Sequence, residues 1–302
     1  MYCRKALILS LLAASSASCS DPPPPAEPYP RAGEDALAWT ARVVALGPRP
    51  SGSEAHRKQQ ALVVAALRAT GAGVEEIAFT AQTPHGPVAM KNVIAKFNGA
   101  SERVVVISGH YDTLSRPDLH FVGANDGGSS TGLLLQLAAM LRERELRDDV
   151  WLVFFDGEES FVQWTGSDHT YGSRYQAAQW SVDGTAERIK ALINVDMIGD
   201  ADLRLVYEQQ STPWLRDLVW DVGVRLGYSD VFADRRPSYI ADDHVSFLEL
   251  GIPALDLIDF EYGGGNSYWH NEQDTMDKLS AASFAVVLHV VLETLGVLAD
   301  RP

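Results

Sequence analysis

Six apolar residues in a row, ending at an acidic turn, limit the folds open to this chain. Residues 150–155 read VWLVFF and are followed directly by Asp156, Gly157, Glu158 and Glu159. Such a run between charged residues is typical of a strand that is buried on both faces of a sheet. Because ligands of open α/β sheets bind just beyond the carboxyl ends of the strands, the two glutamates are expected in a ligand crevice. The alternative is a solvated acidic turn.

Acids and histidines also follow other expected strands. The run 104–108 leads to His110 and Asp112, and the run 191–195 ends at Asp196. Further candidates lie in loops: Asp126, Asp242, Asp243, His244 and His270. Carboxylate and imidazole groups are the ligands of catalytic zinc, which keeps one coordination position open. Glu158 and Glu159 should point in opposite directions on an extended segment, so one can bind metal while the other transfers protons.

Helical segments separate the expected strands, so the sequence predicts an α/β fold. We expect a single three-layer domain with a twisted, mostly parallel (mixed) central sheet and helices on both faces. Strands are expected at 74–80, 88–97, 104–108, 150–155, 191–196 and 254–258. Helices are expected at 36–46, 53–70, 131–145, 214–226 and 280–298, with another ending near Trp180 and a short one after His244.

Composition and charge exclude some partners. The chain has 302 residues, 46% of them hydrophobic, which is enough to bury a full α/β core. Its net charge is -15. Nucleic acid is therefore not expected as a partner, because phosphate binding needs clustered Lys and Arg. A polybasic membrane-binding patch is not expected for the same reason.

The start of the chain is expected to direct export. Residues 1–19 have a basic start, a short apolar run and small residues before Cys19, which is typical of a cleaved export signal. These small residues resemble a bacterial lipoprotein cleavage box, which predicts a periplasmic or cell-envelope protein with a lipid at Cys19. Ordinary cleavage nearby is the alternative. Residues 20–32 form a proline-rich linker before the folded body at 33–302. Cleavage would remove Cys3, the other cysteine, so no disulfide is expected.

The order of these motifs resembles that of the zinc aminopeptidase superfamily. The shared motifs are Gly-His-Tyr-Asp at 109–112, Asn-Asp-Gly at 125–127, Gly-Glu-Glu at 157–159, Asp-Met-Ile-Gly at 196–199 and a late histidine, His270. Within the superfamily, the chain is more similar to the glutaminyl-peptide cyclotransferases. That similarity rests on the segments 121–126, 155–161, 171–174, 242–244 and 269–270, with Trp164. The resemblance covers roughly residues 33 to 300, and the combination is specific although each motif is modest.

The resemblance implies a zinc-dependent catalytic domain at 33–302 with one zinc per chain. The implied reaction converts the N-terminal Gln of a peptide or protein to pyroglutamate and releases ammonia. The residues that it implies fall into three groups: the zinc ligands Asp126, Glu159 and His270; the catalytic acids Glu158, Asp196 and Asp242, of which Glu158 transfers protons; and the substrate-pocket wall of Trp164 and Trp269.

Two other functions remain open. A zinc aminopeptidase on the same fold would use Glu158 to activate water and hydrolyse N-terminal residues. Two-metal aminopeptidases use the histidine that corresponds to His110, so His110, Asp126 and Asp196 are candidates for a second metal site. A non-catalytic binding module should have lost ligands, whereas all the candidate ligands are present. The two tryptophans and the segment 171–174 favour the cyclotransferase.

Overall fold

The computed structural model describes residues 29–301. The predicted export signal, Cys19 and the linker through residue 28 lie outside the described residues. The first helix, α1, spans Pro30–Val44 and so begins slightly before residue 33, where the folded body was expected to start. Proline suits the first turn of a helix because the N–H group that it lacks would have no partner inside the helix there.

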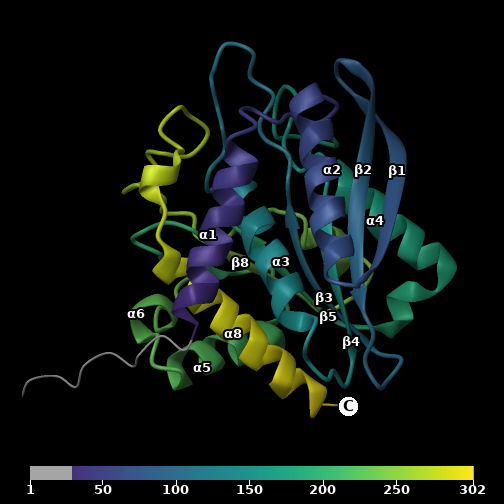
Figure 1. The fold of residues 1–302 in the computed structure, drawn as a ribbon, viewed down its shortest axis with the longest axis vertical. Coiled ribbons are helices and arrows are strands. Elements are labelled where there is room, and N and C mark those ends of the chain that lie inside the picture. The colour runs from purple at the N-terminus through teal and green to yellow at the C-terminus, as the bar shows by residue number, and fades with distance from the viewer. Residues whose placement is uncertain (1–28, 302) are drawn as a thin grey trace, which may run out of the picture.

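A six-stranded mixed sheet lies at the centre of the described chain (Figure 1). Its strands are β1 (Gly73–Thr83), β2 (Gly86–Phe97), β3 (Val104–His110), β4 (Asp149–Phe155), β5 (Ile189–Asp196) and β8 (Ala254–Ile258). They lie in the order β1-β2-β4-β3-β5-β8. The pairs β4–β3, β3–β5 and β5–β8 are parallel, whereas β1–β2 and β2–β4 are antiparallel. The predicted mixed α/β sheet is confirmed, and each expected strand is present.

Helices cover both faces of the sheet (Figure 1). One face is covered by α1, α2 (Glu54–Ala69), α3 (Gly128–Leu141), α5 (Pro213–Arg225) and α8 (Ala281–Ala299). The other face is covered by α4 (Tyr171–Asp183) and α7 (Val245–Leu248). Five short elements were not expected from the sequence, because they are too short to show a periodic pattern: β6 (Tyr207–Glu208), β7 (Pro237–Ser238), α6 (Ser229–Phe232) and the 3-10 turns Thr185–Arg188 and Met276–Lys278.

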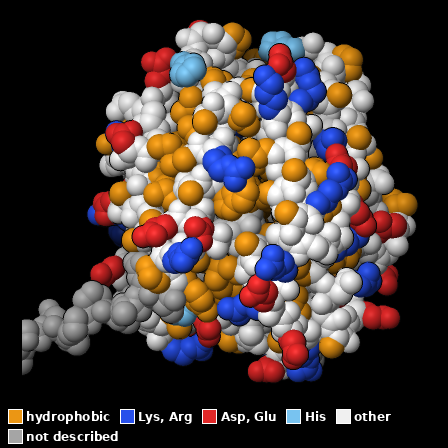
Figure 2. All heavy atoms as spheres, in the orientation of Figure 1, with side chains coloured by type: hydrophobic (Ala, Val, Ile, Leu, Met, Phe, Trp, Pro, Cys, Tyr) orange, Lys and Arg blue, Asp and Glu red, His pale blue; other side chains and the backbone are white. Residues whose placement is uncertain are grey.

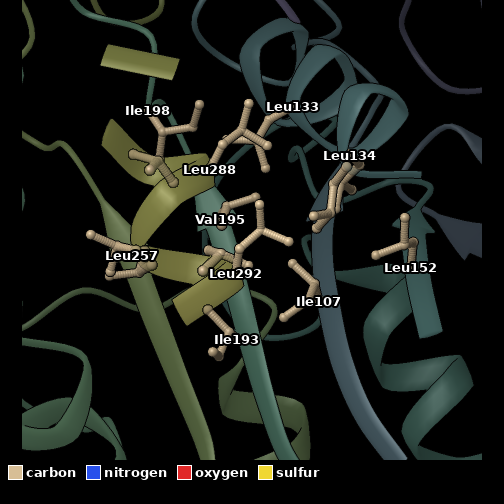
Figure 3. Close-up of a cluster of buried hydrophobic side chains, with 14 of the residues drawn as sticks. Ile107, Leu133, Leu134, Leu152, Ile193, Val195, Ile198, Leu257, Leu288 and Leu292 are labelled. Atoms are coloured by element: carbon tan, nitrogen blue, oxygen red, sulfur yellow. The ribbon is translucent and has the colours of Figure 1, made fainter. Parts of the chain in front are cut away.

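Alternate residues of the central strands pack against opposite helical layers. In β3, Val105 and Ile107 belong to the cluster that includes α3 and α8. Val104 and Val106 belong to the cluster that includes α4. Figure 3 shows Ile107 among aliphatic side chains of neighbouring strands and helices, including Leu288 of α8. Because both faces of the strand are buried, its sequence is apolar without alternation.

Helix α8 is long and apolar enough to cross a membrane by length and composition, alone among the helices of the described residues. In the structure it packs against α1 and α5, and most of its central side chains are buried within the protein. Burial inside the protein accounts for its apolar sequence, so α8 is a core helix.

Charged side chains of both signs are mixed on the face of the molecule that carries α1 and α2. Figure 2 shows Lys and Arg lying among Asp and Glu there. On α2 and the strands beside it, Lys58 lies 2.8 Å from Glu54, and Glu76 pairs with both Arg68 and Lys91. Water screens such exposed pairs, so they contribute little to stability. The stability of the fold must come mainly from the two buried clusters.

Helices α1 and α3 approach closely because α3 carries a glycine at their contact. A Cβ atom on Gly132 would lie 2.6 Å from the carbonyl oxygen of Ala36 and would also overlap the hydroxyl group of Thr40. That hydroxyl donates a hydrogen bond to the same carbonyl oxygen at 3.0 Å. The backbone oxygen cannot move without displacing α1, so the contact requires glycine.

We therefore expect Gly132→Ala to lower the free energy of unfolding by about 1–3 kcal/mol, because overpacking outweighs the better helix propensity of alanine. Gly296→Ala in α8 is a matched control, since no atom lies within 4 Å of a Cβ atom there. The control should be neutral or stabilising by up to about 1 kcal/mol. Urea unfolding followed by circular dichroism measures both variants. Equal effects at the two positions would contradict the packing argument.

Candidate active site

The acidic turn after β4 presents both glutamates at the carboxyl edge of the sheet. Gly157 has a φ of 70°, in the left-handed region that favours glycine. A Cβ atom there would also lie 2.7 Å from Sδ of Met90. The carbonyl oxygens of Gly157 and Glu158 accept hydrogen bonds from the N–H groups of Tyr171 (2.7 Å) and Thr170 (2.8 Å). The start of α4 therefore fixes the backbone of the turn.

A buried carboxylate holds the turn from the other side. Oδ1 of Asp112 accepts a hydrogen bond from the N–H group of Glu158 at 3.1 Å, and Oδ2 accepts one from Glu159 at 3.3 Å. Oδ1 also lies 3.5 Å from Nδ1 of His110. Asp112 thus links the end of β3 to the glutamates that follow β4.

Asp126, Glu159 and His270 come together in a first group. Nε2 of His270 lies 3.3 Å from Oδ2 of Asp126 and 3.3 Å from Oε2 of Glu159. Oδ2 of Asp126 and both carboxylate oxygens of Glu159 are buried and have no hydrogen-bond partner. One ligand atom from each residue lies within 4.8 Å of the others. Two carboxylates and an imidazole that converge without hydrogen bonds fit a metal ion, and this set of donors suits zinc.

His110, Asp126 and Asp196 form a second group that could hold a metal ion. Nε2 of His110 lies 3.1 Å from Oδ1 of Asp126 and 3.2 Å from Oδ1 of Asp196. The contact with Asp196 has the geometry of a hydrogen bond. Oδ1 of Asp196 in the second group therefore has a hydrogen-bond partner, whereas both carboxylate oxygens of Glu159 in the first group have none. Asp126 belongs to both groups and directs one carboxylate oxygen toward each histidine.

Glu158 and Glu159 face different partners, as expected for neighbours on an extended segment. Glu159 belongs to the first group, whereas Oε2 of Glu158 lies 3.8 Å from Nδ1 of His110. Burial raises the pKa of Glu158 well above its usual value, and the charge of Glu159 raises it further, although His110 opposes this. A carboxyl group whose pKa is raised in this way is a better proton donor than an ordinary glutamate and can still accept a proton once ionised.

Burial also shifts the pKa values of the neighbouring acids. It raises the pKa of Glu159 to about 7 and that of Asp196 to about 6. Burial alone would raise the pKa of Asp126 as well, but the nearby imidazoles of His110 and His270 hold it below its usual range. Several buried carboxylates in one place disfavour one another when ionised, and a cation would stabilise them.

Asp126 is held in place by another buried acid, Asp274. Oδ2 of Asp274 accepts a hydrogen bond from the N–H group of Asp126 at 3.1 Å, and Oδ1 accepts one from Asn125 at 2.7 Å. The hydroxyl group of Tyr262 donates to the same Oδ1 at 2.8 Å. Asp274 and Tyr262 are both fully buried. They therefore fix the backbone that presents Asp126.

Asn194 of β5 connects the remaining acids. Its Nδ2 donates hydrogen bonds to Oδ2 of Asp242 at 2.9 Å and to Oδ1 of Asp256 at 3.2 Å. Its Oδ1 accepts a hydrogen bond from the hydroxyl group of Ser108 at 2.9 Å. Asp242 is thereby tied to the strand that ends at Asp196.

A pocket of about 520 Å³ brings the candidate residues to one place. Seven of the predicted site residues line it: Asp126, Glu158, Trp164, Asp196, Asp242, Trp269 and His270. Glu159 and His110 lie behind this surface and are buried. The pocket therefore combines a floor of acids and an imidazole with two indole rings.

The two tryptophans are placed by stacking on histidines. Trp269 stacks on His270 with ring centroids 3.9 Å apart, and Phe260 contacts it edge-on at 5.1 Å. Trp164 stacks on His169 at 4.4 Å with an angle of 11° between the rings. His270 has a φ of 54°, which is rare for a residue with a side chain. Strained backbone of this kind is common at functional sites because the surrounding structure must hold it.

The pocket and the two candidate metal groups bring together nine of the candidate residues named from the sequence: His110, Asp126, Glu158, Glu159, Trp164, Asp196, Asp242, Trp269 and His270. His244 is not among them, because its Nε2 lies 3.2 Å from Oε2 of Glu208. Asp243 is buried but does not line the pocket.

The structure also adds residues that the sequence analysis missed, namely Asp274, Tyr262, Asn194 and Asp256. Most of their hydrogen bonds join distant parts of the sequence: Asp274 lies 149 residues after Asn125, and Asp256 lies 62 residues after Asn194. The only signal that could have found Asp274 is its position shortly after His270 in an acidic segment.

The comparisons with known proteins agree with this geometry. Residues 92–295 match peptidase family M28. The glutaminyl-peptide cyclotransferase of Drosophila melanogaster is 31% identical over 265 residues, covering 79% of this chain and 73% of that relative. A solved glutaminyl cyclase from an Acidobacteriales bacterium has 36% identity and a TM-score of 0.86, with 96% of this chain and 100% of that chain covered. A zinc-dependent exopeptidase from Parabacteroides distasonis has 27% identity and a TM-score of 0.79, with coverages of 89% and 98%.

This chain shares its fold, a mixed central sheet with helices on both faces, with a solved glutaminyl cyclase and a solved zinc-dependent exopeptidase. The chain belongs to peptidase family M28 and, within it, to the glutaminyl-peptide cyclotransferases. The resemblance stated from the motifs is confirmed.

We expect Asp274→Asn to weaken zinc binding by about 10–100-fold, because an amide group cannot accept all the hydrogen bonds that orient Asp126. Competition with a chromophoric chelator measures the affinity. Asp234→Asn is the matched control, since Asp234 also accepts a backbone hydrogen bond, from Arg236 at 2.9 Å, but lies on the surface away from the acids. Unchanged zinc affinity in Asp274→Asn would show that Asp274 does not support the metal site.

Proposed function

We propose that the protein is a zinc-dependent glutaminyl-peptide cyclotransferase. It would convert the N-terminal Gln of peptides or proteins to pyroglutamate and release ammonia. The observation that carries this proposal is the pocket lined by two of the three candidate metal ligands, Asp126 and His270, by a separate carboxyl group and by two indole rings, with Glu159 buried beside it. Membership of the cyclotransferase branch supports the same activity.

One zinc ion per chain would be held by Asp126, Glu159 and His270. Oδ2 of Asp126 and both carboxylate oxygens of Glu159 are buried without a hydrogen-bond partner, so they are free to bind a metal ion. When bound, zinc would supply Lewis acidity toward the carboxamide oxygen of the substrate. His110 is left out of this site, as the resemblance to the cyclotransferases implies, and its Nε2 lies 3.2 Å from Oδ1 of Asp196.

Glu158 would move the proton that the reaction requires. Cyclisation forms a bond between the α-amino nitrogen of Gln and its γ-carboxamide carbon, and breaks the bond from that carbon to the amide nitrogen, which leaves as ammonia. The attacking amine must lose a proton and the departing nitrogen must gain one. Glu158 lines the pocket, lies outside the proposed zinc ligands and has a raised pKa, so it can carry out both transfers.

The other pocket residues would orient the substrate. Asp196 and Asp242 line the pocket and can accept hydrogen bonds from the α-amine and from the leaving nitrogen. Trp164 and Trp269 would hold the bent chain end between them, which brings the amine close to the carboxamide carbon. Such positioning lowers the barrier because it removes the entropy cost of bringing the reacting groups together.

The second candidate is a zinc aminopeptidase, favoured by the group of His110, Asp126 and Asp196. With a metal ion in each group, Glu158 would activate water for hydrolysis of the first peptide bond. This reaction would release free N-terminal residues rather than ammonia.

One experiment distinguishes the cyclotransferase from the aminopeptidase. Purified protein, beginning at about residue 29, is incubated with a peptide that starts with Gln. We expect mass spectrometry to show loss of ammonia from an otherwise intact peptide. Elemental analysis should find about one zinc per chain. Release of free Gln together with about two zinc ions per chain would support the aminopeptidase instead and would return His110 to the metal site.

Glu158→Gln should lower kcat by about 10²–10⁴-fold, because an amide cannot transfer the proton. The zinc content should stay the same, since Glu158 is not one of the proposed ligands. Glu159→Gln is the matched comparison, because it changes the neighbouring residue in the same way and should weaken zinc binding. A fully active Glu158→Gln variant would rule out the proton-transfer role.

Export and a lipid at Cys19 are also part of our proposal, and the pattern of residues 1–19 supports them. Cys19→Ala should move the full-length protein from the membrane fraction to the soluble fraction after cell breakage. Peripheral lipoproteins need their acyl chains for stable attachment. A wild-type protein that is already soluble in the periplasm would contradict lipidation while leaving export intact.

A further inference from the structure

The loop that carries Trp164 is organised around one buried carboxylate, that of Asp168. We call residues 160–169, between Glu159 and α4, the Trp164 loop. Oδ1 of Asp168 accepts a hydrogen bond from the N–H group of Phe161 at 3.0 Å. Oδ2 accepts two more, from Val162 at 2.8 Å and Gln163 at 3.0 Å. Three consecutive N–H groups, directly before Trp164, thus donate to one side chain.

A side chain from α4 also binds this carboxylate. The hydroxyl group of Tyr171 donates to Oδ1 of Asp168 at 2.7 Å. Burial alone would raise the pKa of Asp168, but the hydrogen bonds from the loop N–H groups and from Tyr171 lower it. Hydrogen bonds to a charged acceptor are the stronger kind, so this carboxylate is a firm anchor for the loop.

The Trp164 loop has no strand or helix of its own to satisfy these N–H groups. Its residues form only turns and bends, and Val162 is 64% exposed. Without Asp168, the three N–H groups would have to bind water, and the loop could leave its present path. Asp168 therefore holds the backbone of residues 161–163, while Phe161 packs against Tyr171 and Arg174 donates hydrogen bonds to the carbonyl oxygens of Ser167 and His169 at the other end of the loop.

The position of Trp164 follows from the position of the loop. Ser160, Phe161, Val162, Gln163 and Trp164 line the substrate pocket, whereas Asp168 does not. On its other side, Trp164 stacks on His169, the residue next to Asp168. Asp168 thus holds the chain on both sides of the indole without reaching the pocket itself.

We propose that Asp168 is a positioning residue, which fixes the Trp164 loop at the substrate pocket and thereby sets how tightly peptide N-termini bind. This inference rests on the proposed function for the role of Trp164 in substrate binding. Asp168 would not take part in the chemistry, because it contacts neither the pocket nor the proposed zinc ligands. Its loss should therefore act on KM rather than on kcat.

The test is a double-mutant cycle with a Gln-initiated peptide as substrate. Asp168→Asn keeps the shape of the side chain but replaces one acceptor oxygen with an N–H2 group. We expect KM to rise about tenfold while kcat changes by less than about twofold. Displacing a tryptophan that anchors a ligand commonly lowers the affinity by at least about tenfold. In the Trp164→Ala background, Asp168→Asn should have no further effect on KM, because it acts through the indole.

Two further variants make the result specific. Tyr171→Phe removes only the side-chain donor and leaves the three backbone contacts, so KM should rise in the same direction by about two- to threefold. This variant tests the proposal even if Asp168→Asn fails to fold. Asp183→Asn is the matched control, because Asp183 accepts a backbone hydrogen bond from Thr185 at 2.9 Å at the far end of α4. Its kinetic constants should match the wild type.

Hydrogen exchange tests the anchor without any catalytic assay. The amides of Phe161, Val162 and Gln163 should be protected in the wild type and should exchange at least about tenfold faster in Asp168→Asn. The proposal would be overturned by any of three results. KM could be unchanged in Asp168→Asn, the increases in KM from Asp168→Asn and Trp164→Ala could multiply in the double variant, or the three amides could be unprotected in the wild type. A wild-type protein that cyclises no Gln peptide would contradict the proposed function alone, since exchange still reports on the anchor.

Discussion

The carboxylate of Asp126, held between two imidazoles, is the interaction on which the site depends. Oδ1 faces His110 and Oδ2 faces His270, so segments from β3 and from a loop near the end of the chain meet at one acid. Buried charges are costly unless they are paired. Oδ2 of Asp126 and both carboxylate oxygens of Glu159 have no hydrogen-bond partner, and the negative charge that they concentrate near His270 would be stabilised by a metal ion. The proposed chemistry follows from this concentration of charge, because it fixes where zinc and substrate would bind.

Buried acids that take no part in the proposed chemistry hold the loops of the site. Asp112 accepts hydrogen bonds from the N–H groups of Glu158 and Glu159, and Asp274 accepts one from the N–H group of Asp126. Asp168 accepts three from the N–H groups of residues 161–163, directly before Trp164. Each loop leaves the sheet and so loses the backbone partners that a strand would have. A carboxylate can accept several hydrogen bonds at once, which makes it an effective substitute. The acids of this site therefore form two sets, one directed at the pocket and one at the backbone.

Much of the fold could be predicted from the sequence because its central strands are buried on both faces. The run 150–155 and its acidic turn define β4 and place Glu158 and Glu159 correctly. The grouping of Asp126, Glu159 and His270 came from the family resemblance, since no local pattern joins residues so far apart. Asp274 and Asn194 could not be predicted, because their hydrogen bonds cross the fold and depend on side-chain geometry. The short pair β6–β7 has no periodic pattern to detect.

The central claim is that one zinc ion binds Asp126, Glu159 and His270. The most direct test is a crystal structure of the zinc-loaded protein with anomalous scattering measured at the zinc edge. The account predicts one anomalous peak about 2.0–2.2 Å from ligand atoms of Asp126, Glu159 and His270. Glu158 should face the pocket, and His110 should keep its hydrogen bond to Asp196. A second peak between His110 and Asp196, or a zinc ion bound by Glu158, would contradict the single-metal site and the separate role of Glu158.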